Sequence, residues 1–362
     1  MKIAYVAPAK GIHTIRWANA MAERGHEVTV ISCADHVKKF DGDYHESVKI
    51  VQLRYAAPFG YYLNARQLKN LVNRNGYDVV NVHYASGYGT LGRMASLKNA
   101  VLNIWGSDVY EFPYKSAFNM SVIKKNLAFY KYVASTSRCM VEQSKKLVNR
   151  EYFITPFGVD TKFFRPLEEK NSDDKIVVGT VKMLLPHYGI LDSIKAFVRL
   201  CERLKEEGDL ETEEKLAYEI YGRGKQKKEL QSLIEKSGMT EKIRLCGFVK
   251  NEKLPEVFNT FNVFCCCSLM ESFGVAAVEA MACGVPVVTS DADGFNETVK
   301  DGETGLIAPR GNIERITDCL YKLVKDKEER ERMGMAGARH VKSLYDWDKS
   351  VDTMLSVYER AR

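Results

Sequence analysis

Residues 1–32 read MKIAYVAPAKGIHTIRWANAMAERGHEVTVIS, and this stretch decides the fold. Two short apolar runs, Ile3–Val6 and Glu27–Ser32, are rich in β-branched side chains, which favour strands. Between them, apolar residues recur at helical spacing over Ile12–Gly25, and a glycine is a common end for a helix. The stretch therefore predicts a β-α-β unit, in which a helix joins two parallel strands.

The same alternation of strand and helix patterns continues along the 362 residues. Helical periodicity is clearest over Ile190–Glu207 and Lys225–Ser237. Apolar strands separated by amphipathic helices are typical of parallel sheets covered by helices on both faces, so we expect an α/β fold. The further predicted strands are Lys49–Leu53, Asp78–His83, Val101–Trp105, Tyr132–Thr136, Ile176–Val181, Ala217–Tyr221, Lys242–Cys246, Val263–Cys267 and Val285–Thr289.

A change of composition divides the chain into two such sheets. The segment Thr155–Lys175 contains two prolines, a glycine and an acidic run, without periodicity, which is typical of a linker. We predict one doubly wound, Rossmann-like domain over residues 1–160 and a second over 170–345. The final segment, 346–362, could pack back on the first domain or close the second. Ligands bind at the carboxyl ends of strands in such folds, so we expect two domains facing each other across a ligand-binding cleft.

Composition excludes several classes of protein. The net charge is +6, from 53 basic and 47 acidic residues, without the dense basic blocks of nucleic-acid-binding proteins. Nine cysteines without a C-x-x-C pair indicate a reducing, cytoplasmic environment, and no apolar run is long enough to span a bilayer. The first strand is followed by Ala9-Lys10-Gly11 rather than G-x-G-x-x-G, which argues against a dehydrogenase. No spacing of histidine and cysteine predicts a metal site.

The stretch CSLMESFGVAAVEAMACGVPVV (267–288) is the most informative about chemistry. Within it, Gly274–Cys283 is a predicted helix whose only charged side chain is Glu279. A helix that is apolar on every face is a buried helix. A buried carboxylate needs a partner, since an uncompensated charge in the interior costs several kcal/mol, roughly.

The start of this helix is suited to a phosphate. Backbone N–H groups at Ser272, Phe273 and Gly274, together with the positive end of the helix dipole, form an anion site. Glu271 precedes them in the loop, and Glu279 follows eight positions later. The combination favours a nucleotide-sugar pocket. The alternative is that Glu271 is a solvated loop residue and Glu279 is ion-paired within the core.

The motifs around this helix resemble those of glycosyltransferase family 4, retaining enzymes with the GT-B fold. The likeness extends over nearly the whole chain, although it is weaker in the N-terminal half, where HTIRWANA (13–20) and WGSD (105–108) carry it. The other matching motifs are PFGVDTKFF (156–164), VVGTVK (177–182) with YGI (188–190), YGRG (221–224), GFV (247–249), ESFGVAAVEAMACGVPVV (271–288) and ETVKDGETGLIAP (297–309).

This resemblance implies a role for individual residues. Glu271 would contact hydroxyls of the donor sugar, and Glu279 would contact the ribose. Lys182 would neutralise the departing diphosphate, as a divalent metal does in other enzymes, so that no metal or cofactor is required. The implied reaction is retaining transfer of a sugar to a saccharide or a lipid-linked saccharide in polysaccharide or glycolipid biosynthesis. The remaining implied donor-side residues are Ser272, Phe273, Gly274, Gly222, Phe248, Val249 and Gly11, and the acceptor-side candidates are His13, His83 and Asp108, the last in a turn expected to be open.

Departures from the family pattern keep two alternatives open. Many relatives place an arginine at the position of Met183, a lysine close to His187 and a histidine at the position of Trp105. The chain could therefore be a catalytically silent nucleotide-sugar-binding scaffold, or an epimerase of the same fold. Asp291-Ala-Asp293 imitates a metal-binding D-x-D, but its following glycine favours a turn, and Asp41-Gly-Asp43 is interpreted in the same way.

One helix could contact a membrane. The segment Asn119–Lys131 has an apolar face edged by Lys124, Lys125 and Lys131, as on helices that lie on anionic lipid. Such a protein would be cytoplasmic and peripheral at the inner face of the membrane. The alternative is a helix packed on its own sheet, with its lysines in water.

Overall fold

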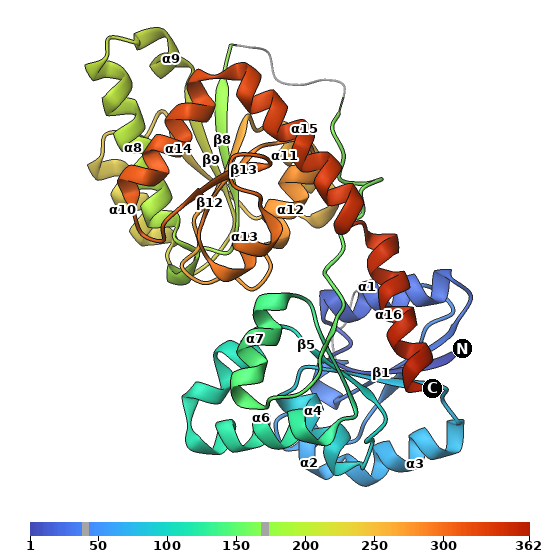
Figure 1. Cartoon of the computed structure of the whole chain (residues 1–362). Coiled ribbons are helices and arrows are strands. Elements are labelled where there is room, and N and C mark those ends of the chain that lie inside the picture. Colours follow the sequence, from blue (N-terminus) through green and yellow to red (C-terminus); the bar gives the residue numbers. More distant parts are fainter. Residues whose placement is uncertain (38–42, 168–173) are drawn as a thin grey trace. The chain divides into compact units, whose positions relative to one another are not determined.

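The computed structural model describes residues 1–37, 43–167 and 174–362, which form two compact units (Figure 1). Unit 1 combines Met1–Pro156 with Asp348–Arg362, and unit 2 comprises Phe157–Trp347. Each unit contains a parallel sheet with helices, which confirms the predicted α/β class and the two doubly wound sheets.

Within the described residues, the sheet of unit 1 has the strand order β3-β2-β1-β4-β5-β6-β7, and every pairing is parallel. The central strand β1 pairs Ile3 with Val28 on one side and with Val79 on the other. β7 was not predicted from the sequence. The strands are β1 (Lys2–Val6), β2 (Glu27–Ser32), β3 (Lys49–Gln52), β4 (Val79–His83), β5 (Val101–Ile104), β6 (Tyr132–Ser135) and β7 (Phe153–Ile154).

The last helix of the chain, α16 (Trp347–Ala361), packs in unit 1. Its Val351 and Tyr358 are fully buried, and the Tyr358 hydroxyl lies 3.0 Å from that of Tyr5 on β1. The amide of Asn81 on β4 donates to the same hydroxyl. The other helices of unit 1 are α1 (Ile12–Glu23), η1 (Ala34–His36), α2 (Gly60–Leu63), α3 (Ala65–Asn75), α4 (Gly87–Met94), α5 (Ser107–Tyr110), η2 (Phe112–Lys115), α6 (Ala117–Phe129) and α7 (Arg138–Leu147).

The helix that the sequence offered for membrane contact, α6, turns its apolar face inward. Ile123 and Leu127 are fully buried in the core of unit 1, and Tyr130, at the end of the helix, is buried beside them. Lys124 and Lys125 are exposed. The apolar face is therefore not available to lipid, and the helix packs on its own unit. In the described part of the chain, no helix is both long and apolar enough to cross a membrane.

The sheet of unit 2 has the order β10-β9-β8-β11-β12-β13 in the described residues, again parallel throughout. β13 was not predicted as a strand. The elements are β8 (Ile176–Val181), η3 (Pro186–Tyr188), α8 (Ile190–Glu206), α9 (Leu210–Lys215), β9 (Leu216–Tyr221), α10 (Lys227–Lys236), β10 (Ile243–Gly247), η4 (Asn251–Lys253), α11 (Leu254–Asn259), β11 (Val263–Cys266), α12 (Val275–Ala282), β12 (Val287–Ser290), α13 (Asp293–Thr298), β13 (Gly305–Ala308), α14 (Ile313–Lys325) and α15 (Lys327–Leu344).

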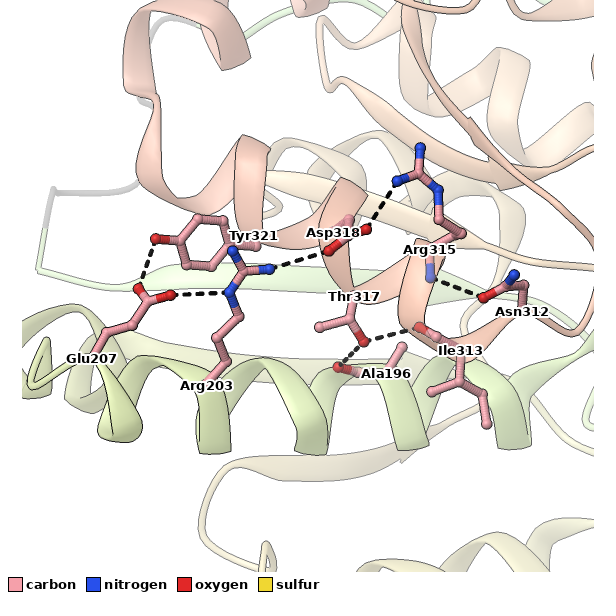
Figure 2. Close-up of polar contacts among 9 residues, drawn as sticks. All are labelled: Ala196, Arg203, Glu207, Asn312, Ile313, Arg315, Thr317, Asp318 and Tyr321. Carbon is pink, nitrogen blue, oxygen red and sulfur yellow. Dashed lines mark hydrogen bonds and ion pairs between the residues drawn. The ribbon is translucent and has the colours of Figure 1, made fainter.

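Helices α8 and α14 pack side by side in unit 2, and Figure 2 shows the polar contacts along their junction. The Thr317 hydroxyl donates to the Ala196 carbonyl at 3.2 Å, deep in the junction. Toward solvent, Arg203 bonds Glu207 at 3.0 Å and Asp318 at 3.1 Å. Exposed ion pairs contribute only about 0–1 kcal/mol each. The buried apolar stripes of the two helices therefore supply most of the stabilisation.

Candidate donor site in unit 2

A pocket of about 300 Å³ lies at the carboxyl ends of strands β8, β9 and β10. This is the edge of a parallel sheet at which ligands bind in doubly wound folds. Mostly apolar walls with a few charged groups suit a flat, partly polar ligand. The lining residues are Val181, Lys182, Met183, Tyr221, Gly222, Arg223, Phe248, Val249 and Leu254.

Gly222 forms part of the pocket wall, at a position where no side chain can be accommodated. A Cβ atom at this position would lie 1.8 Å from the backbone oxygen of Lys182. Backbone hydrogen bonds fix the same turns, from the Lys182 N–H to the Tyr221 carbonyl at 2.9 Å and from the Gly222 N–H to the Gly247 carbonyl at 2.7 Å. The loops after the three strands are thereby locked together into a preformed site.

Phe248 presents an aromatic face at this pocket. Its side chain is 60% exposed, and the guanidinium of Arg223 lies 4.5 Å from the ring centroid. A cation over the face of an aromatic ring is attracted to it by about 0.5–1 kcal/mol at an exposed site, which favours this orientation of the ring. Val249 and the half-exposed Met183 complete the wall. The pocket thus brings together three of the donor-side residues that the resemblance implied, namely Gly222, Phe248 and Val249.

Lys182 and Glu271 form an ion pair at 2.6 Å, although 89 positions separate them in the chain. Their side chains are only 13% and 12% exposed, so Glu271 is not a solvated loop residue. Burial alone lowers the pKa of Lys182, but the Glu271 carboxylate outweighs it and holds that pKa above its ordinary value. The ring of Tyr188 lies 4.5 Å from the ammonium group. Lys182 is therefore a cation throughout the physiological pH range.

The loop Glu271–Gly274 leads directly into α12. Gly274 has φ = 87°, a conformation that favours glycine, and a Cβ atom there would lie 2.5 Å from the ring of Phe295. The loop is fixed by a hydrogen bond from the Gly294 N–H to the Glu271 carbonyl at 2.9 Å. Among the described residues, the N–H groups of Phe273 and Gly274 have no acceptor. The Ser272 N–H, the third group predicted for the anion site, instead donates to the Glu271 carboxylate at 3.3 Å. Anion binding by the N–H groups of Phe273 and Gly274 stays a prediction.

Glu279 lies on α12 and is 9% exposed. The helix is apolar around the carboxylate, with Val278 and Ala280 fully buried. The prediction of a buried carboxylate on an apolar helix is confirmed. Its assignment to a ribose hydroxyl stays a prediction.

Asp291 and Asp293, the two carboxylates of the D-x-D imitation, are both ion-paired with Arg310. Asp291 accepts from the backbone N–H of Arg310 at 2.9 Å and from its side chain at 3.0 Å, and Asp293 lies 3.6 Å from the same guanidinium. Asp293 is the first residue of helix α13, so the prediction of a turn at this position was wrong. In the described ranges no three His, Cys, Asp or Glu side chains gather as a metal site, and metal independence stays an expectation. Asp41 of the second imitation lies outside the described residues.

The acceptor-side candidates His13 and His83 lie in unit 1, near the ends of β1 and β4. Trp105 joins them, because its ring stacks on His13 at 5.0 Å and meets the edge of His83 at 4.8 Å. Burial lowers the pKa of His13 to about 4 and that of His83 to about 3. Both rings are therefore neutral at physiological pH and cannot act as cations toward a phosphate. Gly11 precedes α1 at its N-cap position, also in unit 1.

Asp108 does not lie in an open turn, and the sequence-based expectation for it was wrong. The residue is 1% exposed, and burial raises the pKa of its carboxyl group. Its carboxylate accepts from the N–H groups of Ala85 at 2.8 Å, Trp105 at 3.1 Å and Gly106 at 2.9 Å. The side chain therefore ties the loop after β4 to the loop after β5.

The resemblance paired Tyr188 and Gly189 with Lys182, and the structure places the Tyr188 ring beside the Lys182 ammonium group. The turn that presents Tyr188 ends at Gly189, with φ = 63°, where a Cβ atom would lie 1.9 Å from the Cys267 carbonyl oxygen. The Leu269 N–H donates to the His187 carbonyl at 2.8 Å. This close approach brings the loop after β8 against the loop after β11.

Two family models match the chain, and together they define its class. Residues 161–340 match the glycosyl transferases group 1, and residues 2–137 match the glycosyl transferase 4-like family. The chain belongs to the group 1 glycosyltransferases of the family 4 type, as the resemblance indicated.

Similar proteins match over nearly the full length. An uncharacterized glycosyltransferase of Methanocaldococcus jannaschii is 26% identical over 354 residues, which cover 93% of this chain and 86% of the relative. Sucrose-phosphate synthase of Thermosynechococcus elongatus superposes with a TM-score of 0.83 at 18% identity, covering 99% and 98% of the two chains. The Anabaena protein HepE in complex with UDP and glucose gives 0.77 at 17% identity, covering 99% of each. These structures confirm the GT-B fold.

Proposed function

We propose that this member of a glycosyltransferase family with nucleotide-sugar donors is a retaining, metal-independent hexosyltransferase. It acts on a saccharide or a lipid-linked saccharide in polysaccharide or glycolipid biosynthesis. The observation that carries this proposal is the buried Lys182–Glu271 pair beside the pocket of Gly222 and Phe248.

The diphosphate of the donor lies between two positive features. One is the permanently charged ammonium of Lys182, and the other is the N-terminus of α12 with the N–H groups of Phe273 and Gly274. Preorganised donors of this kind stabilise the charge that develops on a departing phosphate. The base lies against Phe248, and Glu279 accepts from the ribose hydroxyls.

Glu271 takes the hydroxyls of the transferred sugar. In the free protein Glu271 is ion-paired with Lys182. When the donor binds, its diphosphate takes over part of the interaction with Lys182, and its sugar hydroxyls take over part of the interaction with Glu271. In the retaining reaction, the acceptor oxygen attacks the anomeric carbon on the face that the diphosphate leaves. The bond from the anomeric carbon to the phosphate oxygen breaks, the acceptor oxygen forms the new bond, and the acceptor proton passes to a phosphate oxygen.

The donor is best sought among uridine nucleotides, since the structurally similar HepE of Anabaena binds UDP together with glucose. The test is incubation with UDP-, GDP- and ADP-sugars, with and without EDTA, scored for free nucleotide. Slow hydrolysis that survives EDTA supports the proposal. Adding lipid-linked saccharides should increase turnover and give a product with the donor's anomeric configuration by NMR. Activity that EDTA abolishes, or an inverted product, would overturn the retaining, metal-independent assignment.

The alternatives from the sequence predict other outcomes in the same experiment. Met183 lines the pocket where many relatives place an arginine, which favours a scaffold that binds nucleotide sugar without turning it over. Binding by calorimetry without turnover in any mixture would establish that scaffold. Release of nucleotide together with an epimerised free sugar, independent of acceptor, would indicate an epimerase.

A Glu279→Ala variant tests the ribose assignment. We expect the affinity for nucleotide to fall about tenfold or more while the protein stays folded, because the carboxylate makes a charge-assisted hydrogen bond. Calorimetry with a nucleoside diphosphate, alongside circular dichroism, measures both. Unfolding of the variant would instead assign Glu279 to core stability.

A further inference from the structure

Arg223 carries an unpaired charge at the pocket of Gly222 and Phe248. Among the nine described residues that line this pocket, only Lys182 and Arg223 are charged. The charge of Lys182 is balanced by the Glu271 carboxylate at 2.6 Å. The exposed guanidinium of Arg223 forms no ion pair and no hydrogen bond with any residue that the structure describes. The uncompensated positive charge on the pocket wall is therefore that of Arg223.

The backbone of Arg223 is held in one place by the loop after β8. The strands β8 and β9 end at paired residues, so Met183 and Arg223 occupy matching positions in adjacent loops. The Leu184 N–H donates to the Arg223 carbonyl at 3.0 Å. Directly after Arg223, a Cβ atom at Gly224 would lie 2.2 Å from the Leu184 carbonyl oxygen. The backbone is therefore fixed beside the pocket, while the exposed side chain is free to reorient.

The guanidinium of Arg223 lies over the ring that the proposed function assigns to the base. It is 4.5 Å from the centroid of the Phe248 ring in the free protein. Stacking of a base on an aromatic ring is stronger than a cation–π contact at an exposed site, so an arriving base displaces the guanidinium. The displaced guanidinium stays beside the pocket, where the phosphates of the same nucleotide offer it acceptor oxygens.

We propose that Arg223 is a donor-binding residue whose guanidinium contacts the phosphates of the nucleotide once the base covers Phe248. The two-pronged guanidinium matches the spacing of phosphate oxygens and binds them through parallel hydrogen bonds. A diphosphate carries more than one negative charge, and Lys182 is shared with Glu271, so a second cation completes the charge balance. This inference deepens the proposed function, on which it rests for the statement that the ligand is a nucleotide sugar.

Arg223→Gln tests the inference by comparing ligands with and without phosphate. We expect the affinity for UDP to fall about tenfold or more, because charge-assisted hydrogen bonds are lost. The affinity for uridine should stay equal or rise, because the guanidinium no longer occupies the Phe248 ring. Calorimetry measures UDP directly and uridine by competition with UDP, and the guanosine and adenosine ligands are measured alongside. Circular dichroism should be unchanged, since the side chain is exposed.

Lys225→Gln is the matched control. Lys225 is exposed on the same loop and carries the same charge, yet it does not line the pocket. We expect this variant to bind UDP like the parent chain. Met183→Arg is then added to Arg223→Gln, because Met183 is half-exposed and lines the same pocket from the adjacent loop. It should restore UDP affinity severalfold, a rescue that a merely structural role of Arg223 would not show.

Three results would overturn the inference. Equal weakening of UDP and uridine in Arg223→Gln would place the side chain on the base. Equal weakening of UDP in Lys225→Gln would indicate a diffuse attraction and no contact. If the parent chain binds UDP and Arg223→Gln binds it equally well, the role of Arg223 fails and the donor site stands. If the parent chain binds none of the nucleoside diphosphates, the proposed function fails first, and this inference falls with it.

Discussion

Replacing Glu271 with glutamine separates the structural and ligand-binding roles of the Lys182–Glu271 pair. The substitution keeps the shape of the side chain but leaves the buried ammonium of Lys182 without the carboxylate that lies 2.6 Å away. Removing one member of a buried ion pair costs about 3–5 kcal/mol. Both side chains are still about one-eighth exposed, so we expect the lower end of this range, a loss of about 3 kcal/mol in the free energy of unfolding.

The Glu271→Gln substitution should change the affinities for a nucleoside diphosphate and for the corresponding nucleotide sugar in opposite directions. A nucleoside diphosphate brings an anion to Lys182, and in the glutamine variant that anion no longer competes with Glu271. Its affinity should stay equal or rise, up to about tenfold for one charge-assisted hydrogen bond. The corresponding nucleotide sugar loses its contact with the carboxylate, so its affinity should fall relative to the diphosphate.

The assay is a double-mutant cycle with Lys182→Met and the combined variant. Urea unfolding followed by circular dichroism gives the stabilities, and calorimetry gives both affinities for each protein. Removing both partners should cost at least about 2 kcal/mol less than the sum of the single changes. Additive stability changes, or equal weakening of diphosphate and nucleotide sugar in Glu271→Gln, would refute the reasoning.

Three further substitutions follow from the geometry. Gly222→Ala places a Cβ atom 1.8 Å from the Lys182 carbonyl oxygen, so the loops after β8 and β9 must move apart. Nucleotide affinity measured by calorimetry should therefore fall more than about tenfold. Unchanged affinity would contradict the conclusion that no side chain fits at position 222 of the pocket wall. Phe248→Ala removes an exposed ring, so it should lower nucleotide affinity about tenfold yet change the melting temperature little, a combination that thermal scans with and without nucleotide detect. His83→Gln should reduce the loss of unfolding free energy that occurs as the pH falls. The pKa of His83 is about 3 when folded and about 6.5 when unfolded, so the native protein loses about 2 kcal/mol between pH 7.5 and pH 5.0, and the variant should lose about 2 kcal/mol less by urea unfolding at both pH values.

The sheets and the donor loop could be predicted because local patterns determine them. Alternating apolar strands and helices identify the parallel sheets, and a glycine before an apolar run identifies the start of α12 at Gly274. β7 was missed because Phe153–Ile154 is too short to show a period. β13 was missed because Gly305–Ala308 is a four-residue strand that starts with glycine, a residue depleted in strands.

Pairings between distant residues could not be predicted. Lys182 and Glu271 were each expected in the site, yet only the fold brings them to 2.6 Å. The error at Asp108 has the same origin, because one of its hydrogen-bond donors, Ala85, lies on another loop. For α6, periodicity revealed an apolar face but could not distinguish a lipid surface from the protein's own core.

The membership of α16 in unit 1 has a consequence for biosynthesis. The ribosome makes all of β1–β7 first, then the whole of unit 2, and only afterwards the helix that carries Tyr358. Until then the Tyr5 hydroxyl and the Asn81 amide lack their buried partner. Although it is made first, the sheet of unit 1 therefore completes its core only after the final segment has emerged, in contrast to the usual order in which the first-made domain folds first.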